Sequence, residues 1–201
     1  YFNVNFWAKL FGKKKNKEKS KYLPENEIPN DLSFVKKFTI KGGRFLFCEN
    51  QYETISNFNE ILVENNWNLN EVFSLNEDLN EKFKIEIINK NSSPKDFKTC
   101  LIKCEFLISN TGLILVCDKQ IKHYKLKELP NTLIILSETN QFSKDVSEAM
   151  SLLKNKYKNV IPANITTINI YNYLEIENTL NLDKNNSKNI YLLLQDSNKN
   201  E

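Results

Sequence analysis

The longest apolar stretch of the chain, residues 99–117, constrains the fold more than any other feature of the sequence. It reads TCLIKCEFLISNTGLILVC, and a polar turn ending in Thr111-Gly112 interrupts it. Apolar runs bounded by turns are typical of strands buried inside an α/β domain. We therefore place this stretch in the domain core, with a strand, LILV, directly after the turn.

Helical and strand patterns alternate along the rest of the chain. Short apolar runs predict buried strands at 44–48, 71–75, 132–136 and 190–194. Helical spacing of apolar residues predicts helices between them, the clearest one running from Phe142 to Tyr157. No Asn-Gly turn joins adjacent strands, and the sequence has no internal repeat. This alternation predicts an α/β fold with a mainly parallel open sheet and helices on both faces.

The first 30 residues differ in composition from the rest. Apolar side chains with helical spacing come first, at Phe2, Phe6, Trp7, Leu10 and Phe11. A cluster of lysines follows within 13–21, and Pro24 and Pro29 interrupt any later helix. We expect an aromatic and basic arm with its linker at 1–30 and a single α/β domain at 31–201.

Two interpretations of the arm stay open. Its aromatic face and lysines suit a weak contact with an anionic membrane surface. Alternatively, the same aromatic side chains dock on the domain itself or on a partner protein. The arm has little more than two helical turns before Gly12 ends it, which favours the second interpretation.

The charge pattern argues against a nucleic-acid partner. The net charge is +3, and Arg44 is the single arginine of the chain. Arginine supplies the planar fork that grips phosphates at two points, and nucleic-acid-binding domains are usually strongly basic. We therefore expect no nucleic-acid binding.

The cysteines do not form a metal-binding pattern. No CxxC pair occurs among the four cysteines, which are Cys48, Cys100, Cys104 and Cys117, and His123 is the single histidine. Zinc sites usually show paired ligands at short spacing, so we expect no metal site. Neither GxGxxG nor GxxxxGK[ST] occurs, and we expect no cofactor. Without a signal peptide or an apolar run near 20 residues, a cytoplasmic, thiol-reduced protein is expected.

A series of short motifs in a fixed order carries a family resemblance. The motifs are Gly42-Gly43 before FLFC, Cys104-Glu105 ahead of ISNTG, Thr111-Gly112 before LILV, Leu129-Pro130 before TLIIL, IPANITTI at 161–168, and the closing IYLLL. From about residue 31 to about 196, the chain resembles the LUD (lactate utilization) domain. This family is a branch of the sugar-phosphate isomerase and CoA-transferase-like superfamily.

The resemblance implies a cytosolic α/β domain whose relatives accompany iron–sulfur and membrane-associated subunits in L-lactate oxidation. Two positions depart from the family pattern. Asn110 stands where the family commonly has the Glu of Glu-Thr-Gly, and an amide cannot act as a general base. The segment 182–189 lacks the Gly and His that many members have before the last strand. Both changes remove groups that would bind or activate a small anion.

We favour an accessory or small-anion-binding LUD domain linked to L-lactate oxidation, because Glu105 lies five residues before Asn110 and would need a different backbone placement to replace the missing carboxylate. Its ligand-binding candidates are Asn110, Thr111, Gly112, Asn164 and Thr166. The main alternative is an enzyme of the superfamily's acyl-transfer or isomerase type, in which Glu105 takes over the carboxylate role. A membrane-recruited adaptor that acts through the N-terminal arm is a further alternative. The expected partners are iron–sulfur redox subunits.

Overall fold

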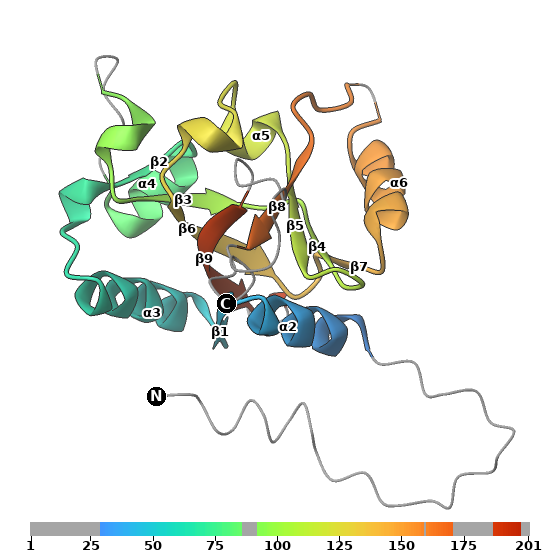
Figure 1. Cartoon of the computed structure of the whole chain (residues 1–201), viewed down its shortest axis with the longest axis horizontal. Helices are drawn as coiled ribbons and strands as arrows, with labels where there is room; N and C mark the ends of the chain where they lie inside the picture. The colour runs from blue at the N-terminus through green and yellow to red at the C-terminus, as the bar shows by residue number, and fades with distance from the viewer. Residues whose placement is uncertain (1–28, 86–91, 159, 171–186, 198–201) are drawn as a thin grey trace, which may run out of the picture.

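The computed structural model describes residues 29–85, 92–158, 160–170 and 187–197 (Figure 1). The aromatic and basic arm expected at the N-terminus lies outside the described residues, apart from the end of its linker. Most of the segment 182–189 that departs from the family pattern is also outside them.

A parallel sheet forms the centre of the molecule. Its strands, in spatial order, are β2 (Val72–Ser74), β3 (Thr99–Lys103), β6 (Thr132–Glu138), β9 (Ser187–Gln195) and β1 (Arg44–Cys48). Each neighbouring pair of these strands is parallel. The register places Ser137 beside Leu194, and Leu194 beside Phe47. The predicted mainly parallel α/β sheet is confirmed.

A second group of strands continues from the first residues of β9. It consists of β8 (Thr166–Ile170), β5 (Leu113–Val116), β4 (Phe106–Ile108) and β7 (Phe142–Ser143). β4 and β5 form an antiparallel hairpin, and β5 is antiparallel to β8. The central apolar stretch of the sequence therefore forms three strands, β3, β4 and β5.

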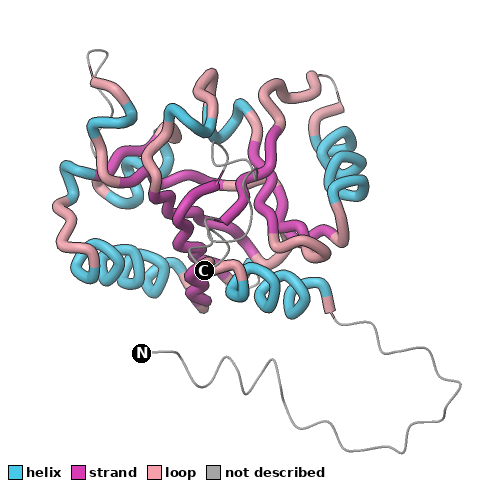
Figure 2. The backbone as a smooth tube through the Cα atoms, in the orientation of Figure 1, coloured by secondary structure: helices cyan, strands magenta, loops and turns pink. Residues whose placement is uncertain are grey.

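Helices cover both faces of the parallel sheet (Figure 2). The helices are α2 (Asn30–Ile40), α3 (Gln51–Glu64), α4 (Glu77–Phe83), α5 (Asp118–Ile121) and α6 (Val146–Lys156), with short 3₁₀ turns η1 (Leu69–Glu71), η2 (Pro94–Asp96) and η3 (Leu126–Glu128). α3 and α4 bury Phe58, Ile61 and Leu79 on one face. α2 buries Phe34 and Val35 on the other face, where part of the second strand group also packs. Within the described residues, no helix has the length and apolarity needed to cross a bilayer.

The prediction that a helix begins at Phe142 is wrong. Phe142 lies in β7, where it pairs with Leu107, and its ring packs edge-on to Phe34 at 5.7 Å between centroids. α6 begins only at Val146, because the side chain of Asp145 caps its first turn by accepting a hydrogen bond from Glu148 N–H. The four-residue spacing between Phe142 and Val146 is therefore not a helical contact.

The carboxyl ends of β1, β6 and β9 meet at one edge of the parallel sheet. The register brings Cys48, Gln195 and Glu138 to the same level there. Open α/β sheets usually bind ligands in the crevice outside this edge. The first turn of α2 lies at the same edge, beside the end of β1.

Candidate functional site

The Asn-Thr-Gly turn joins β4 to β5 and packs against α2. Its backbone donors are engaged within the fold: Asn110 N–H donates to Lys144 O at 3.0 Å, and Gly112 N–H donates to Ile108 O at 2.8 Å. Lys37 Nζ donates to the carbonyl of Asn110, which anchors the turn on α2. The side chain of Asn110 is exposed, whereas Gly112 is buried.

Gly112 is required by the contact between this turn and α2. Its φ is +70°, in the left-handed region that favours glycine. A Cβ atom there would lie 2.8 Å from the backbone nitrogen of Phe38 and 3.0 Å from the carbonyl carbon of Lys37. The glycine therefore has a packing role that is independent of any ligand.

The other two predicted ligand residues lie at the far end of β5. Thr166 begins β8 and pairs with Val116, the last residue of β5. The four residues of β5, about 13 Å of strand, therefore lie between Thr166 and the turn that contains Thr111. Asn164 has a positive φ of 51°, and its amide donates to Lys122 O and Tyr124 O at 3.3 and 2.9 Å. The structure does not bring the five predicted residues together.

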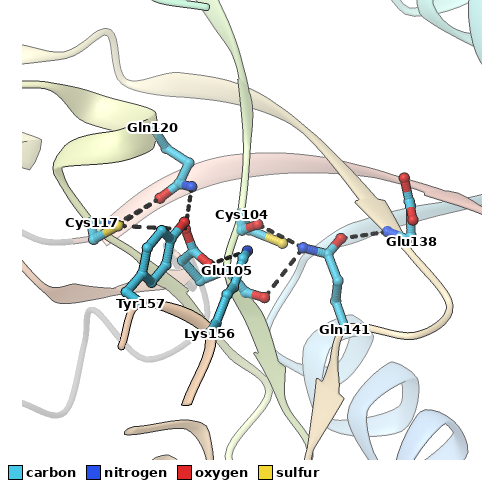
Figure 3. Close-up of polar contacts among 8 residues, drawn as sticks. All are labelled: Cys104, Glu105, Cys117, Gln120, Glu138, Gln141, Lys156 and Tyr157. Carbon is cyan, nitrogen blue, oxygen red and sulfur yellow. Dashed lines mark hydrogen bonds and ion pairs between the residues drawn. The ribbon is translucent and has the colours of Figure 1, made fainter. Parts of the chain in front are cut away.

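Glu105 is the centre of a buried polar cluster (Figure 3). Its carboxylate is fully buried and accepts hydrogen bonds from Gln120 Nε2 at 2.7 Å and from Tyr157 O–H at 2.8 Å. Lys156 Nζ forms an ion pair with the other carboxylate oxygen at 2.7 Å. The carboxylate therefore links the beginning of β4 to α5 and to the C-terminal end of α6.

Neighbouring backbone groups of this cluster are also fixed. Gln141 Nε2 donates to Cys104 O at 2.7 Å and to Glu105 O at 3.2 Å. Its side-chain oxygen accepts from Glu138 N–H at 2.7 Å. The loop after β6 thus holds the entry to β4 in place, as Figure 3 shows.

The electrostatics of Glu105 favour the ionised carboxylate. Burial alone would raise its pKa, but hydrogen bonds from Lys156, Gln120 and Tyr157 outweigh burial and hold the pKa of Glu105 below its usual value. A general base needs an accessible lone pair and a pKa near the working pH. The surroundings of Glu105 thus fit a structural carboxylate better than the catalytic one of the enzyme alternative.

The cysteines are buried thiols. Burial raises the pKa of Cys100 and Cys104 well above the usual range, and it raises the pKa of Cys117 to about 12. Thiols of this kind are poor nucleophiles at neutral pH. Across the described ranges, no group of three or more metal-ligating side chains is close enough to hold an ion.

A cavity of about 240 Å³ lies at the carboxyl edge of the parallel sheet. Its apolar walls are Val35 of α2, Phe47 of β1, Phe142 of β7 and Leu194 of β9. Asn30, Asp31 and Thr139 are its polar lining residues. No sequence motif marked this cavity, because its walls come from four separate parts of the chain.

Comparisons with known proteins identify the family. The LUD domain profile matches residues 33–195, which is most of the chain. The chain belongs to the LUD domain family. A crystal structure of a DUF162 family protein from Deinococcus radiodurans resembles this LUD domain with a TM-score of 0.59 and 12% sequence identity. The match covers 87% of this chain and all of that one, and at this identity it shows a shared fold. A search among curated proteins gives no match.

One charged residue of the LUD domain is buried without a counter-charge in the described residues. Lys188 of β9 is 3% exposed, and its Nζ donates to Leu129 O at 2.9 Å. Burial, with a smaller contribution from the charge of Lys95, lowers the pKa of Lys188 to about 8. Protonation of this amine below that pH therefore opposes folding.

Replacing Lys188 by methionine is expected to change how stability depends on pH. Between about pH 8 and about 10.4 the unfolded wild-type chain holds the Lys188 proton and the folded chain does not, so wild-type stability rises with pH in this window. The free energy of unfolding of the wild type should rise by about 1–2 kcal/mol across this window, once relaxation of the structure around the amine is considered. Urea unfolding of wild type and Lys188→Met at pH 7.5 and 10 measures it. An equal change in both proteins would contradict the prediction.

Proposed function

We propose that this LUD domain is an accessory subunit of L-lactate oxidation that binds a small anion and has no catalysis of its own. The family match over residues 33–195 is the observation that carries the link to lactate utilization. The partners that we infer are iron–sulfur redox subunits, which would supply the electron transfer of L-lactate oxidation.

The surroundings of the two candidate catalytic positions support an accessory role over an enzymatic one. By the resemblance, Asn110 stands where the family commonly has a carboxylate, and its side chain is exposed. The carboxylate of Glu105 is fully buried and is bound by four donors, the fourth being the Cys117 thiol at 3.5 Å. A substrate could reach Glu105 only if side chains that bind its carboxylate, among them those of Lys156 and Tyr157 at the end of α6, moved away.

A gene deletion tests the role in lactate oxidation. We expect the soluble and membrane fractions of cells that lack the gene to lose L-lactate-dependent dye reduction. A plasmid that encodes the wild-type chain should restore this activity. Affinity purification of a tagged chain should then recover protein-bound iron and acid-labile sulfide. Unchanged L-lactate oxidation in the deletion strain would refute the proposal.

Turnover by the purified chain distinguishes the enzyme alternative. Acyl-CoA thioesters and L-lactate with a dye acceptor are the substrates to assay. We expect no turnover above background in either assay. Turnover that survives Asn110→Ala but disappears in Glu105→Gln, with both variants shown to be folded, would establish the enzyme in place of the accessory subunit.

A further inference from the structure

The cavity at the carboxyl edge of the sheet is large enough for an aromatic side chain. Its walls Val35 and Leu194 are buried, whereas the rings of Phe47 and Phe142 are only half-buried. An apolar cavity of roughly 150 Å³ is known to take up a benzene ring. At about 240 Å³, this cavity therefore has room for a phenyl or an indole ring.

The polar end of the cavity carries one carboxylate. Asp31 of α2 lines the cavity, and its Oδ1 accepts a hydrogen bond from Leu32 N–H at 2.8 Å. The described residues supply no donor to its Oδ2. A buried indole has an apolar body and one N–H group, which usually finds an acceptor. A tryptophan side chain therefore matches these walls and this carboxylate better than a phenylalanine does.

The described part of the chain begins beside the cavity. Asn30 and Asp31, its second and third residues, both line it. Trp7 of the aromatic and basic arm precedes Asn30 by 23 positions. A chain of this length spans at most about 75 Å, whereas α2 is only about 16 Å long. Trp7 can therefore reach the cavity of its own domain, where its attachment gives an effective concentration on the order of millimolar.

Charge complementarity favours the same occupant. Glu49 comes two positions after Phe47, and Asp196 comes two positions after Leu194. This spacing returns the side chains of a strand to one face of its sheet, here the face that carries the cavity. Together with Asp31, two further carboxylates thus lie at this edge. The arm has six lysines and one acidic residue within 13–21, so its charge is opposite to that of the edge.

We propose that the cavity binds Trp7 of the same chain. The indole ring packs between Phe47 and Phe142, its N–H group donates to the Asp31 carboxylate, and the lysines within 13–21 contact the acidic edge. This inference goes beyond the proposed function and does not depend on it. The docked arm covers the edge where open α/β sheets usually bind ligands, so release of the arm uncovers that edge.

Fluorescence of Trp7 in the full chain tests the docking. Trp67→Phe leaves Trp7 as the single tryptophan of the chain, and circular dichroism checks that this variant is folded. We expect Trp7 emission to be shifted to the blue and its quenching by acrylamide to be weaker than in the chain unfolded in urea. Equal quenching in the folded and unfolded chains would overturn the proposal.

The same measurement distinguishes the chain's own cavity from that of a second copy. Docking within one chain makes the emission and the quenching independent of protein concentration. A blue shift that appears only as the concentration rises, together with a dimer in light scattering, would show that Trp7 binds another copy. That result would also overturn the proposal.

Substitutions in the cavity locate Trp7. Asp31→Ala removes the acceptor of the indole N–H and should lower the ratio of protected to exposed Trp7 about fivefold, as the loss of one hydrogen bond implies. Asp78→Ala is the matched control, because Asp78 is the second residue of α4 as Asp31 is of α2. Thr139→Phe fills the cavity from a half-buried position and should expose Trp7. Quenching that Asp31→Ala and Thr139→Phe both leave unchanged would place Trp7 elsewhere.

Vesicles distinguish the cavity from a membrane surface as the binding place of the arm. The single-tryptophan chain is mixed with vesicles of phosphatidylcholine and phosphatidylglycerol and then sedimented. We expect Trp7 to be protected from acrylamide already before the vesicles are added. If protection appears only with the vesicles, and the chain sediments with them, the arm is a membrane contact and the proposal fails.

Discussion

Gly112→Ala is expected to lower the free energy of unfolding by about 2–5 kcal/mol, a large part of the stability of a domain of this size. The residue has a φ of +70°, which costs an alanine about 1–2 kcal/mol. The added Cβ would also lie 2.8 Å from Phe38 N. That neighbour is helix backbone, so the clash can be relieved only by moving the hairpin away from α2. Urea unfolding followed by circular dichroism measures the loss.

Asn110→Ala is the matched control for this prediction. It lies in the same turn, its side chain is exposed, and the carbonyl that Lys37 binds is retained in alanine. Its free energy of unfolding should therefore stay within about 0.5 kcal/mol of wild type. If Gly112→Ala is as stable as Asn110→Ala, the hairpin does not pack on α2 as described, and the turn becomes available again as a ligand site.

The parallel half of the fold follows from local sequence patterns. RFLFC coincides with β1, TLIIL begins β6 and IYLLL lies within β9. β6 and β9 are buried on both faces and apolar at nearly every position, so they are visible in the sequence without knowledge of their neighbours. The prediction that 44–48 is also a buried strand is wrong, because β1 lies at the edge of the sheet and only Cys48 is fully buried. The order of the strands in the sheet depends on the crossover connections. The fold class could therefore be predicted from the sequence, but the strand order could not.

The antiparallel half was harder to predict because its short strands depend on distant partners. β7 is only Phe142–Ser143, and it exists through its pairing with Leu107 and Ile108. Apolar spacing near Phe142 is equally compatible with the first turn of a helix, which was the prediction made. The polar cap at Asp145 was the available signal that α6 begins later.

The candidate site, like the fold, could be predicted from the sequence only in part. Glu105 could be singled out because a carboxylate inside an apolar run must be paired if it is buried. Its partners Gln120, Lys156 and Tyr157 could not be named, since they are 15 to 52 residues away and no local pattern links them to Glu105. The cavity was not predicted either, because concavity belongs to the packing of α2 and β7 on the sheet and has no local pattern.

Glu105→Gln is expected to lower the free energy of unfolding by about 2–4 kcal/mol at pH 7. The amide keeps the volume of the carboxylate but replaces one acceptor oxygen with a donor. Gln120, Tyr157 and Lys156 all donate to the native carboxylate, so at least one donor must then face the new NH₂ group. Lys156→Met should cost less, about 1–2 kcal/mol, because the Lys156 side chain is 52% exposed and solvent screens the pair.

The pH dependence of the same variant gives a second measurement of this cluster. The pKa of Glu105 is lowered in the folded protein, so its contribution is complete above the unfolded value of about 4.3 and is lost as the pH falls through the folded pKa. In that window the unfolded chain binds more protons, and wild-type stability must fall with acidification. Urea unfolding at pH 6 and at pH 3 should therefore show the difference between wild type and Glu105→Gln becoming smaller at pH 3. A difference that stays constant would mean that the carboxylate is not stabilised by its hydrogen-bond donors, and it would reopen the case for Glu105 as a reactive acid.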